Sequence, residues 1–561
     1  MLLLKTITLF LLIIQLYETN AVDVLITIPN GTLKGRLEFS LRKSVRFNAF
    51  QNIPYAKPPI NDLRFMDPEP AEPWEGVLDA SSTDQRPCFQ VADWGNFTGQ
   101  TEDCLYLNVY SPEKPYIDKS LPVIFYIYGG GFNSGYSGFY QAGPHYLIES
   151  GVVVVTVGYR VGPFGFLSTG EEGVPGNQGL KDQNLALRWV KDNIKYFGGD
   201  PDKITIMGGS AGGSSVTYHM MSPKSRGLFR AGISHSGSLL CPWSYQSEAK
   251  SLAYKLAVTI DPQFNLEATS EELVAYLKSV SAESIIAAAK SFGEGVGTEE
   301  LVQGFFWAPV IEHEHDGAFI TESPYQAVES GKMARVPLLI GINSEEALDR
   351  ITYGYFPQSV KAYDADVKAL VNKNMGITDP YRLVEVGTKI RNIYTNGGLL
   401  QENIANAIRY FSDMSFTRSV IRHAQLQSAY SDVYFYQFSY DGQLGGIRPA
   451  LEGAERVAHS VEGSYVWCYG NSSNLESNSP ADVLTSERFR TLLTNFVKYL
   501  DPTPEAISLL NRVIWPTVKN DDFKYLNINV TLNVDTDPKK ETYSKWVELY
   551  ENEAEKPYVT Y

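Results

Sequence analysis

The segment ITIMGGSAGGSSV, residues 204–216, limits the possible folds more than any other part of this sequence. An apolar, strand-like run over residues 204–207 leads into Gly208-Gly209-Ser210-Ala211-Gly212, which fits the pattern G-x-S-x-G, and a helix is expected to follow. In this motif the strand turns so sharply into the helix that the serine adopts a strained backbone conformation, so its neighbours must be small. We therefore predict that Ser210 is a nucleophile exposed at the carboxyl end of a sheet.

A second glycine cluster precedes this motif in the chain. Residues 123–128 form an apolar run, and Gly129-Gly130-Gly131 follows it directly. Glycine allows backbone N–H groups to come close enough to bind the oxyanion of a tetrahedral intermediate. We expect the N–H groups of Gly130, Gly131 and Ala211 to form this oxyanion hole. Two plain glycine turns with an incidental serine are the alternative, which the order of both motifs on successive strands disfavours.

Short β-branched runs alternate with helical patterns through the first half of the chain. Strands are expected over residues 105–110, 122–128, 152–159, 204–207, 336–342 and 433–438. A helix is expected over 179–197, and residues 250–300 have the composition and spacing of a helical insertion. Alternating strands and helices predict an α/β fold with a large, mostly parallel central sheet flanked by helices.

Several longer stretches share their order with one enzyme family. They are Asn52-Ile-Pro-Tyr-Ala-Lys-Pro-Pro59, Leu63-Arg-Phe65, Glu102-Asp-Cys-Leu-Tyr-Leu-Asn-Val-Tyr110, YGGGF at 128–132, Tyr159-Arg160, Gly165-Phe-Leu-Ser168, Asn177-Gln-Gly-Leu-Lys-Asp-Gln183, Phe197-Gly-Gly-Asp-Pro201, and GGSAGG at 208–213. On these residues the chain resembles the type-B carboxylesterase and cholinesterase family of α/β-hydrolases. The stretch Ser236-Gly-Ser-Leu-Leu-Cys-Pro-Trp243 is similar to secreted insect members. The resemblance implies hydrolysis of small to medium apolar esters through a covalent acyl-enzyme, without a cofactor.

The expected general base is His459, one of seven histidines. Hydrolases of this fold order their triad along the chain as nucleophile, acid and histidine. His459 follows the strand expected to end at residue 438 and matches the position of the family's catalytic histidine. The remaining histidines are less suited by position or context, and these are His145, His219, His235, His313, His315 and His423.

The expected acid follows the buried strand that ends near residue 342. By chemistry alone Glu345, Glu346 and Asp349 compete for the role. The family pattern G-x-N-x-x-E-G assigns Glu346, although Ala347 stands where the last glycine is usual. Proton transfer requires that Ser210 and His459 meet within about 3 Å, so the intervening chain must form one folded unit. We therefore predict a single domain over residues 22–561 with long loop and helical insertions.

The N-terminus indicates secretion. Residues 1–21, MLLLKTITLFLLIIQLYETNA, resemble a signal peptide cut after Ala21, and the apolar run is too short for a membrane anchor. No later segment is long and apolar enough for a membrane span. Glycosylation sequons begin at Asn30, Asn96, Asn471 and Asn529, which fits an extracellular glycoprotein.

Charge and cysteine content restrict the partners and the cross-links. Lys and Arg total 48 against 64 Asp and Glu, so the net charge of −16 disfavours nucleic acids and anionic membranes. Of four cysteines, Cys88 and Cys104 are close in sequence and are the expected disulfide, while Cys241 and Cys468 are expected to be buried thiols. A small-molecule ester is the expected partner, with no obligate protein partner.

Three other functions compete with a general esterase. His313 and His315 could begin a metal site, but no further spaced His/Cys set accompanies them, so no metal is expected. The resembling family also includes catalytically silent adhesion proteins that lack the serine, whereas here all three triad positions are filled. A specialised juvenile-hormone or choline esterase is the third. Within the Cys88–Cys104 loop, Trp94 is a weak candidate for binding a quaternary ammonium, and Gly209 replaces the glutamate that many members carry before the nucleophile.

Overall fold

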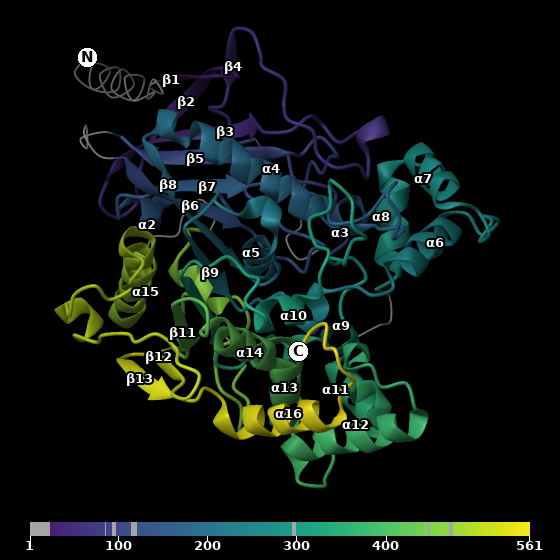
Figure 1. Ribbon diagram of the computed structural model, residues 1–561. Helices are drawn as coiled ribbons and strands as arrows, with labels where there is room; N and C mark the ends of the chain where they lie inside the picture. Colours follow the sequence, from purple (N-terminus) through teal and green to yellow (C-terminus); the bar gives the residue numbers. More distant parts are fainter. Residues whose placement is uncertain are drawn as a thin grey trace, which may run out of the picture.

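The computed structural model describes residues 23–84, 86–92, 97–113, 120–293, 299–446, 449–469 and 475–561. Within these residues the strands form one large twisted sheet (Figure 1). The strands are β1 Asp23–Ile28, β2 Gly31–Phe39, β3 Arg46–Pro54, β4 Val77–Asp79, β5 Tyr106–Pro112, β6 Leu121–Ile127, β7 Val153–Val157, β8 Gly199–Gly209, β9 Ala231–His235, β10 Leu338–Asn343, β11 Val433–Phe438, β12 Lys524–Ile528 and β13 Leu532–Thr536.

The centre of the sheet is parallel and its two margins are antiparallel. The strand order is β1-β2-β3-β5-β7-β6-β8-β9-β10-β11-β12-β13, with β4 beside β2. The run from β7 to β12 pairs in parallel, which confirms the expected mostly parallel centre. The antiparallel pairs at β1 to β7 and β12 to β13 were not expected from the sequence. The strand expected over 105–110 lies in this margin as β5.

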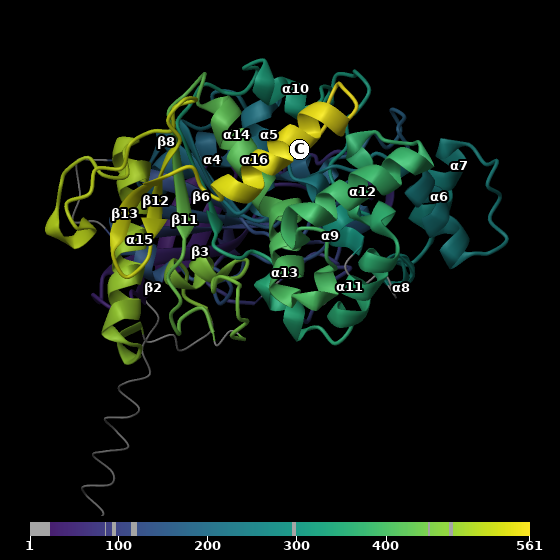
Figure 2. The ribbon, with the colours of Figure 1, turned by 90° about the horizontal axis from the view of Figure 1, so that it is seen from below.

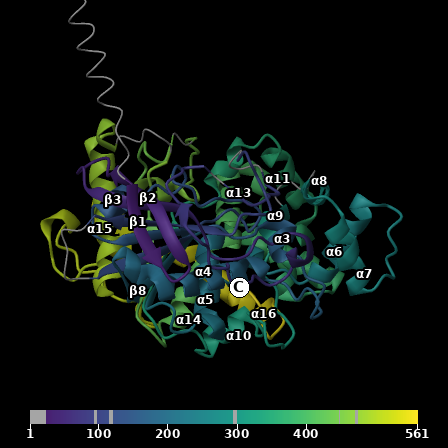
Figure 3. The same cartoon turned by 90° about the horizontal axis from the view of Figure 1, so that it is seen from above.

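Helices cover both faces of the sheet. They are α2 His145–Ile148, α3 Gly162–Phe166, α4 Gln178–Asn193, α5 Ala211–Met221, α6 Ala249–Ile260, α7 Ser270–Ser279, α8 Ala282–Ser291, α9 Glu299–Gln303, α10 Pro324–Glu329, α11 Phe356–Ala365, α12 Pro380–Thr395, α13 Ile404–Ser412, α14 Arg418–Gln427, α15 Pro480–Tyr499 and α16 Lys540–Glu553. Helices α4, α5 and α14 lie on one face and α15 lies on the other (Figure 2). Helix α2 packs beside α15 against β5 and β7 (Figure 1). The expected helical insertion is present as α6 to α8, where α6 and α7 project from one side of the molecule (Figure 3).

Burial explains why the central strands could be read from the sequence. Every residue of β7 and of β10 is buried, as expected for strands covered on both faces. By contrast, β2 carries Lys34, Arg36 and Glu38 along its length and is only partly buried. The register of the centre also sets the site, because Ile127 at the end of β6 is level with Gly208 near the end of β8. The glycine turn after β6 therefore lies beside the turn after β8.

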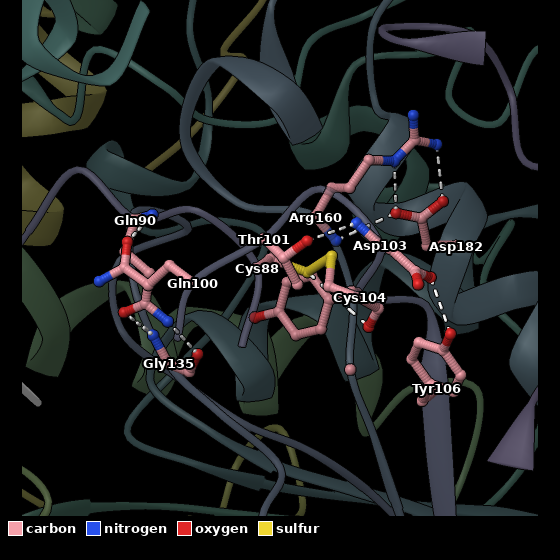
Figure 4. Close-up of a disulfide and its surroundings, with 12 residues drawn as sticks. Cys88, Gln90, Gln100, Thr101, Asp103, Cys104, Tyr106, Gly135, Arg160 and Asp182 are labelled. Carbon is pink, nitrogen blue, oxygen red and sulfur yellow. Dashed lines mark hydrogen bonds and ion pairs between the residues drawn. A yellow bond between two sulfur atoms is a disulfide. The ribbon is translucent and has the colours of Figure 1, made fainter. Parts of the chain in front are cut away.

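The expected disulfide between Cys88 and Cys104 is present, with the two Cα atoms 5.1 Å apart (Figure 4). Cys241 and Cys468 are buried thiols. Asn30 lies in the turn between β1 and β2, and Asn529 follows β12; both are partly exposed. Asn96, Asn471, Trp94 and the expected signal peptide lie outside the described residues. In the described part of the chain, no helix has the length and apolarity needed to cross a bilayer.

Candidate active site

Ser210 occupies a strained turn between β8 and α5. Its backbone angles are φ 55° and ψ −124°, and it forms the N-cap of α5. Its N–H donates to the His235 carbonyl at 2.7 Å, and its carbonyl accepts from Ser214 N at 2.9 Å. A Cβ at Gly212 would lie 2.1 Å from the Ile127 carbonyl oxygen, so a larger residue cannot be accommodated there without movement of the backbone. The glycines are thus required by close packing around the serine, as the sequence predicted.

The glycine turn after β6 presents backbone donors beside this serine. A Cβ at Gly129 would lie 2.6 Å from the Gly209 carbonyl oxygen and 3.1 Å from Ser210 Cβ, which shows how closely the two turns approach. Gly130 and Gly131 have φ angles of 110° and 59° and line the same cavity as Ser210. Within the described residues, no acceptor meets the N–H of either glycine. These groups are available to bind a negatively charged oxygen.

Glu346 and His459 form a hydrogen-bonded pair at the edge of the cavity. His459 Nδ1 lies 2.8 Å from Glu346 Oε2, and the His459 N–H donates to the Glu346 carbonyl at 2.9 Å. The Glu346 side chain is fully buried, whereas that of His459 is 21% exposed. Because a carboxylate is only an acceptor, the proton of this pair is on Nδ1 and Nε2 is left as the basic nitrogen.

The competing acids have other partners. The carboxylate of Glu345 accepts from Ser412 Oγ at 2.9 Å and from the Glu455 N–H at 3.1 Å. Asp349 lines the cavity, further along the same turn. Of the three carboxylates that the sequence left open, Glu346 is the one paired with His459.

Three of the rejected histidines are buried within the core and hydrogen-bonded there. His219 is hydrogen-bonded to Ser225 and Gln183. His235 is hydrogen-bonded to Tyr436, and His423 to Ser238. Burial lowers the pKa of each of these three imidazoles to about 3, which keeps them neutral at physiological pH. His313 and His315 stack on each other at 4.9 Å, and the described residues contain no group of three side chains suited to a metal ion.

The structure adds Ser236 to the predicted set. Its hydroxyl donates to Glu346 Oε1 at 2.6 Å, and the Asn343 N–H donates to the same oxygen at 2.7 Å. Ser236 has a φ of 48° directly after β9, so it sits in a strained position at the same edge of the sheet. The two donors fix the Glu346 carboxylate in place. A serine directly after an apolar strand was the signal available in the sequence.

Phe416 packs against the face of the His459 imidazole. Its ring stacks on His459 with centroids 4.2 Å apart. Phe416 belongs to a π-helical turn, Asp413–Thr417, between α13 and α14. Such turns are often found at functional sites, and this one directs an aromatic ring into the cavity. The stacking limits rotation of the imidazole without occupying either of its nitrogens.

The cavity that these residues border has a volume of about 580 Å³. Its walls are rich in aromatic side chains, and its lining includes Asp349, Arg350 and Tyr353. The remaining lining side chains are mainly Tyr126, Trp243, Leu301, Phe305, Phe416, Trp467 and Tyr469. A cavity of this size and lining suits an apolar small molecule.

A second buried carboxylate, Glu462, lies in the same cavity wall. It is 3% exposed and accepts a hydrogen bond from Asn343 Nδ2, which also donates to the Ala458 carbonyl at 2.8 Å. Burial, followed by the negative charge of Glu346, raises the pKa of Glu462 to about 7. Burial, together with the negative charge of Glu462, raises the pKa of the Tyr126, Tyr436 and Tyr469 hydroxyls.

The Glu462→Gln variant is expected to gain stability relative to wild type as pH rises. Because the folded pKa exceeds the unfolded value, the stabilising contribution of protonated Glu462 is present at low pH and is lost as pH rises through about 7. Glutamine imitates the protonated acid, so the difference in free energy of unfolding should widen from pH 5 to pH 8, by at most about 3 kcal/mol. Urea unfolding at both pH values measures it. The expectation would be contradicted if the difference in free energy of unfolding between variant and wild type were the same at pH 5 and pH 8. It would also be contradicted if the exposed control Glu314→Gln showed an equal change with pH.

These features define an α/β-hydrolase, in which a serine at a strand-to-helix turn borders the same cavity as a histidine–carboxylate pair. The chain belongs to the carboxylesterase family, which matches residues 22–546. It is 32% identical to venom carboxylesterase-6 of Apis mellifera, over 93% of this chain and 94% of that protein. It is 31% identical to juvenile hormone esterase of Tribolium castaneum, over 84% and 83%. The protein is accordingly an enzyme, a carboxylesterase.

A solved structure confirms the fold. The crystal structure of juvenile hormone esterase from Manduca sexta, with OTFP covalently attached, aligns with a TM-score of 0.82 at 26% identity. The alignment covers 94% of this chain and 100% of that chain. The resemblance stated from the sequence, including the likeness to insect esterases, is confirmed.

Proposed function

We propose that the protein is a secreted serine carboxylesterase with Ser210 as nucleophile, His459 as general base and acid, and Glu346 as the acid that orients the imidazole. The N–H groups of Gly130, Gly131 and Ala211 form the oxyanion hole. The observation that carries the proposal is the shared cavity. Ser210, in its strained turn, borders the same space as the unpartnered glycine amides and the His459–Glu346 pair.

The chemistry proceeds through a covalent acyl-enzyme. Ser210 Oγ attacks the ester carbonyl carbon while His459 Nε2 takes the hydroxyl proton, and the carbonyl oxygen becomes the oxyanion bound by the amides. The tetrahedral intermediate collapses, the C–O bond to the alcohol breaks, and His459 returns the proton to the leaving oxygen. A water molecule then attacks the acyl group with His459 again as base, which releases the carboxylic acid and regenerates Ser210.

The direct test is covalent labelling. A fluorophosphonate phosphonylates an activated serine, and we expect stoichiometric labelling, loss of esterase activity, and a single modified peptide that contains Ser210. Preincubation with a chelator should leave both labelling and activity unchanged. Esterase activity that survives full treatment with the fluorophosphonate but is lost with the chelator would instead support metal-dependent hydrolysis.

The substrate is proposed to be an apolar ester of small to medium size. The aromatic side chains that line the 580 Å³ cavity support this choice. Similar proteins include a venom carboxylesterase, a para-nitrobenzyl esterase and a juvenile hormone esterase. A panel of p-nitrophenyl esters of increasing chain length, juvenile hormone and a choline ester separates the general esterase from the two specialised alternatives. A preference in kcat/KM of more than 100-fold for one specialised ester would assign it.

Secretion, glycosylation and domain organisation complete the proposal. Residues 1–21 are proposed to be removed as a signal peptide, and the mature chain to be one domain over residues 22–561. Asn30 and Asn529 are partly exposed, which supports their modification. Asn96 and Asn471 are proposed on their sequons alone. Expression in insect cells should place an active glycoprotein in the medium with residue 22 at its N-terminus.

A further inference from the structure

The loop closed by the Cys88–Cys104 disulfide is hydrogen-bonded to the turn that carries the oxyanion glycines. The contact is made by Gln90, two residues after the first cysteine (Figure 4). Gln90 Nε2 donates to the Gly135 carbonyl at 2.7 Å, and the Gly135 N–H donates to Gln90 Oε1 at 3.1 Å. The carboxamide thus pairs with both polar groups of one backbone residue, as a neighbouring strand would. Gln90 is 1% exposed, so water cannot replace these bonds without rearrangement.

The same loop makes a second contact with the turn, at Asn133, which is two residues closer to the glycines in sequence than Gly135. The N–H of Val91 donates to the Asn133 carbonyl at 2.9 Å. Asn133 and Ser134 in turn donate their N–H groups to the Gly130 carbonyl at 2.9 and 3.0 Å. Residues 133–135 are therefore held on one side by the disulfide loop and hold Gly130 on the other.

The hydrogen bonds at the Gly130 carbonyl decide where the Gly131 N–H points. In a trans peptide the carbonyl of one residue and the N–H of the next point in opposite directions. Because the Gly130 carbonyl is turned toward Asn133 and Ser134, the Gly131 N–H is turned away from them. Gly131 lines the cavity beside Ser210. The N–H of the Gly130–Gly131 peptide can donate to the oxyanion only while the turn over residues 130–134 keeps this conformation.

Because residue 135 is a glycine, the conformation of the turn depends on hydrogen bonds from residues outside it. Its φ is 125°, and a Cβ there would lie 2.2 Å from the Tyr128 ring, so the position requires glycine. Glycine is also the residue with the greatest backbone freedom. The paired hydrogen bonds from Gln90 restrict that freedom at the end of the turn.

We propose that Gln90 is a positioning residue for the oxyanion hole: by holding Gly135, it fixes the turn over residues 130–134 and with it the Gly131 N–H. The inference rests on the proposed function, because it assumes that this N–H stabilises the transition state. Gln90 does not touch the substrate. The disulfide serves the same purpose, since it anchors the loop that carries Gln90.

Gln90→Met tests the proposal, because methionine has similar length but cannot form either hydrogen bond. For p-nitrophenyl butyrate, kcat is expected to fall by about 10- to 100-fold with KM within about twofold, a smaller loss than the roughly 10²- to 10³-fold typical when a donor is removed. A trifluoromethyl ketone binds as a hemiketal oxyanion, so its affinity should fall by the same factor as kcat/KM. The affinity of the matching alcohol, which lacks an oxyanion, should not change.

Two further variants keep the test decisive. Gln90→Glu retains the size but places a carboxylate oxygen against the Gly135 carbonyl oxygen, so kcat and ketone affinity should fall at least as far as in Gln90→Met. Gln427→Met is the control, because Gln427 is also buried but lies at the end of α14 and donates to Ser431 Oγ rather than to the turn. Gln90 variants with a lowered Tm but wild-type kcat and ketone affinity would overturn the proposal, as would an equal loss in Gln427→Met. Wild-type protein that resists fluorophosphonate would refute the proposed function itself, which separates the two failures.

Discussion

Replacing Ser210 with alanine is expected to lower kcat by about 10⁶-fold while the fold is retained. Alanine removes the only atom that can form the acyl bond. The residual rate would come from substrate binding and the oxyanion donors alone. The strained φ of 55° disfavours alanine as much as serine, so little stability should be gained or lost. Burst kinetics with p-nitrophenyl acetate and fluorophosphonate labelling measure the effect, and both signals should disappear.

Ser214→Ala provides the matched control for this variant. Ser214 lies one turn further along α5, is buried, and within the described residues its hydroxyl has no hydrogen-bond partner. Its loss should therefore leave kcat within about twofold of wild type, since no hydrogen bond is broken. A burst that persists in Ser210→Ala would show that another residue is the nucleophile. In that case the assignment of His459 and Glu346 would fall with it.

The central strands were predictable because their physical requirements are local. Strand β7 is buried on both faces and reads as an uninterrupted β-branched run, and the runs at β10 and β11 behave in the same way. The antiparallel margin is different. Strand β2 mixes charged and apolar residues, and its neighbour β3 pairs with β5, more than fifty residues away in the chain. Nothing in the sequence of either strand specifies such a partner.

The same distinction separates the site residues that were predicted from those that were not. Ser210 and the oxyanion glycines are set by close backbone packing, which leaves a pattern of glycines in the sequence. Ser236 and Gln90 act through contacts with residues 110 and 45 positions away. An isolated serine or glutamine carries no sign of such a contact. Glu346 lies between these cases. The residues alone allowed Glu345, Glu346 or Asp349 as the acid, and only the family pattern assigned Glu346.

Replacing Glu346 with glutamine is expected to lower kcat by about 10⁴-fold with little change in KM. Oε1 of Glu346 receives two donors, Ser236 Oγ and the Asn343 N–H, so the oxygen of a glutamine amide must occupy that position. Its NH₂ group then faces His459 Nδ1, where Glu346 Oε2 now lies at 2.8 Å. An amide donor can bond only to an unprotonated Nδ1, which places the imidazole proton on Nε2. That tautomer cannot accept the Ser210 proton.

Glu345→Gln is the control that isolates this effect. Glu345 is adjacent and equally buried, but its partners are Ser412 and the Glu455 N–H rather than the imidazole. The Glu345→Gln variant should lose stability and keep kcat within about threefold, because no tautomer changes. The loss in Glu346→Gln should also lessen at high pH, where hydroxide attack does not need the histidine as base. If both variants lost activity equally, the carboxylate would act through the packing of the turn, and the pairing of Glu346 with His459 would not be the reason for its effect.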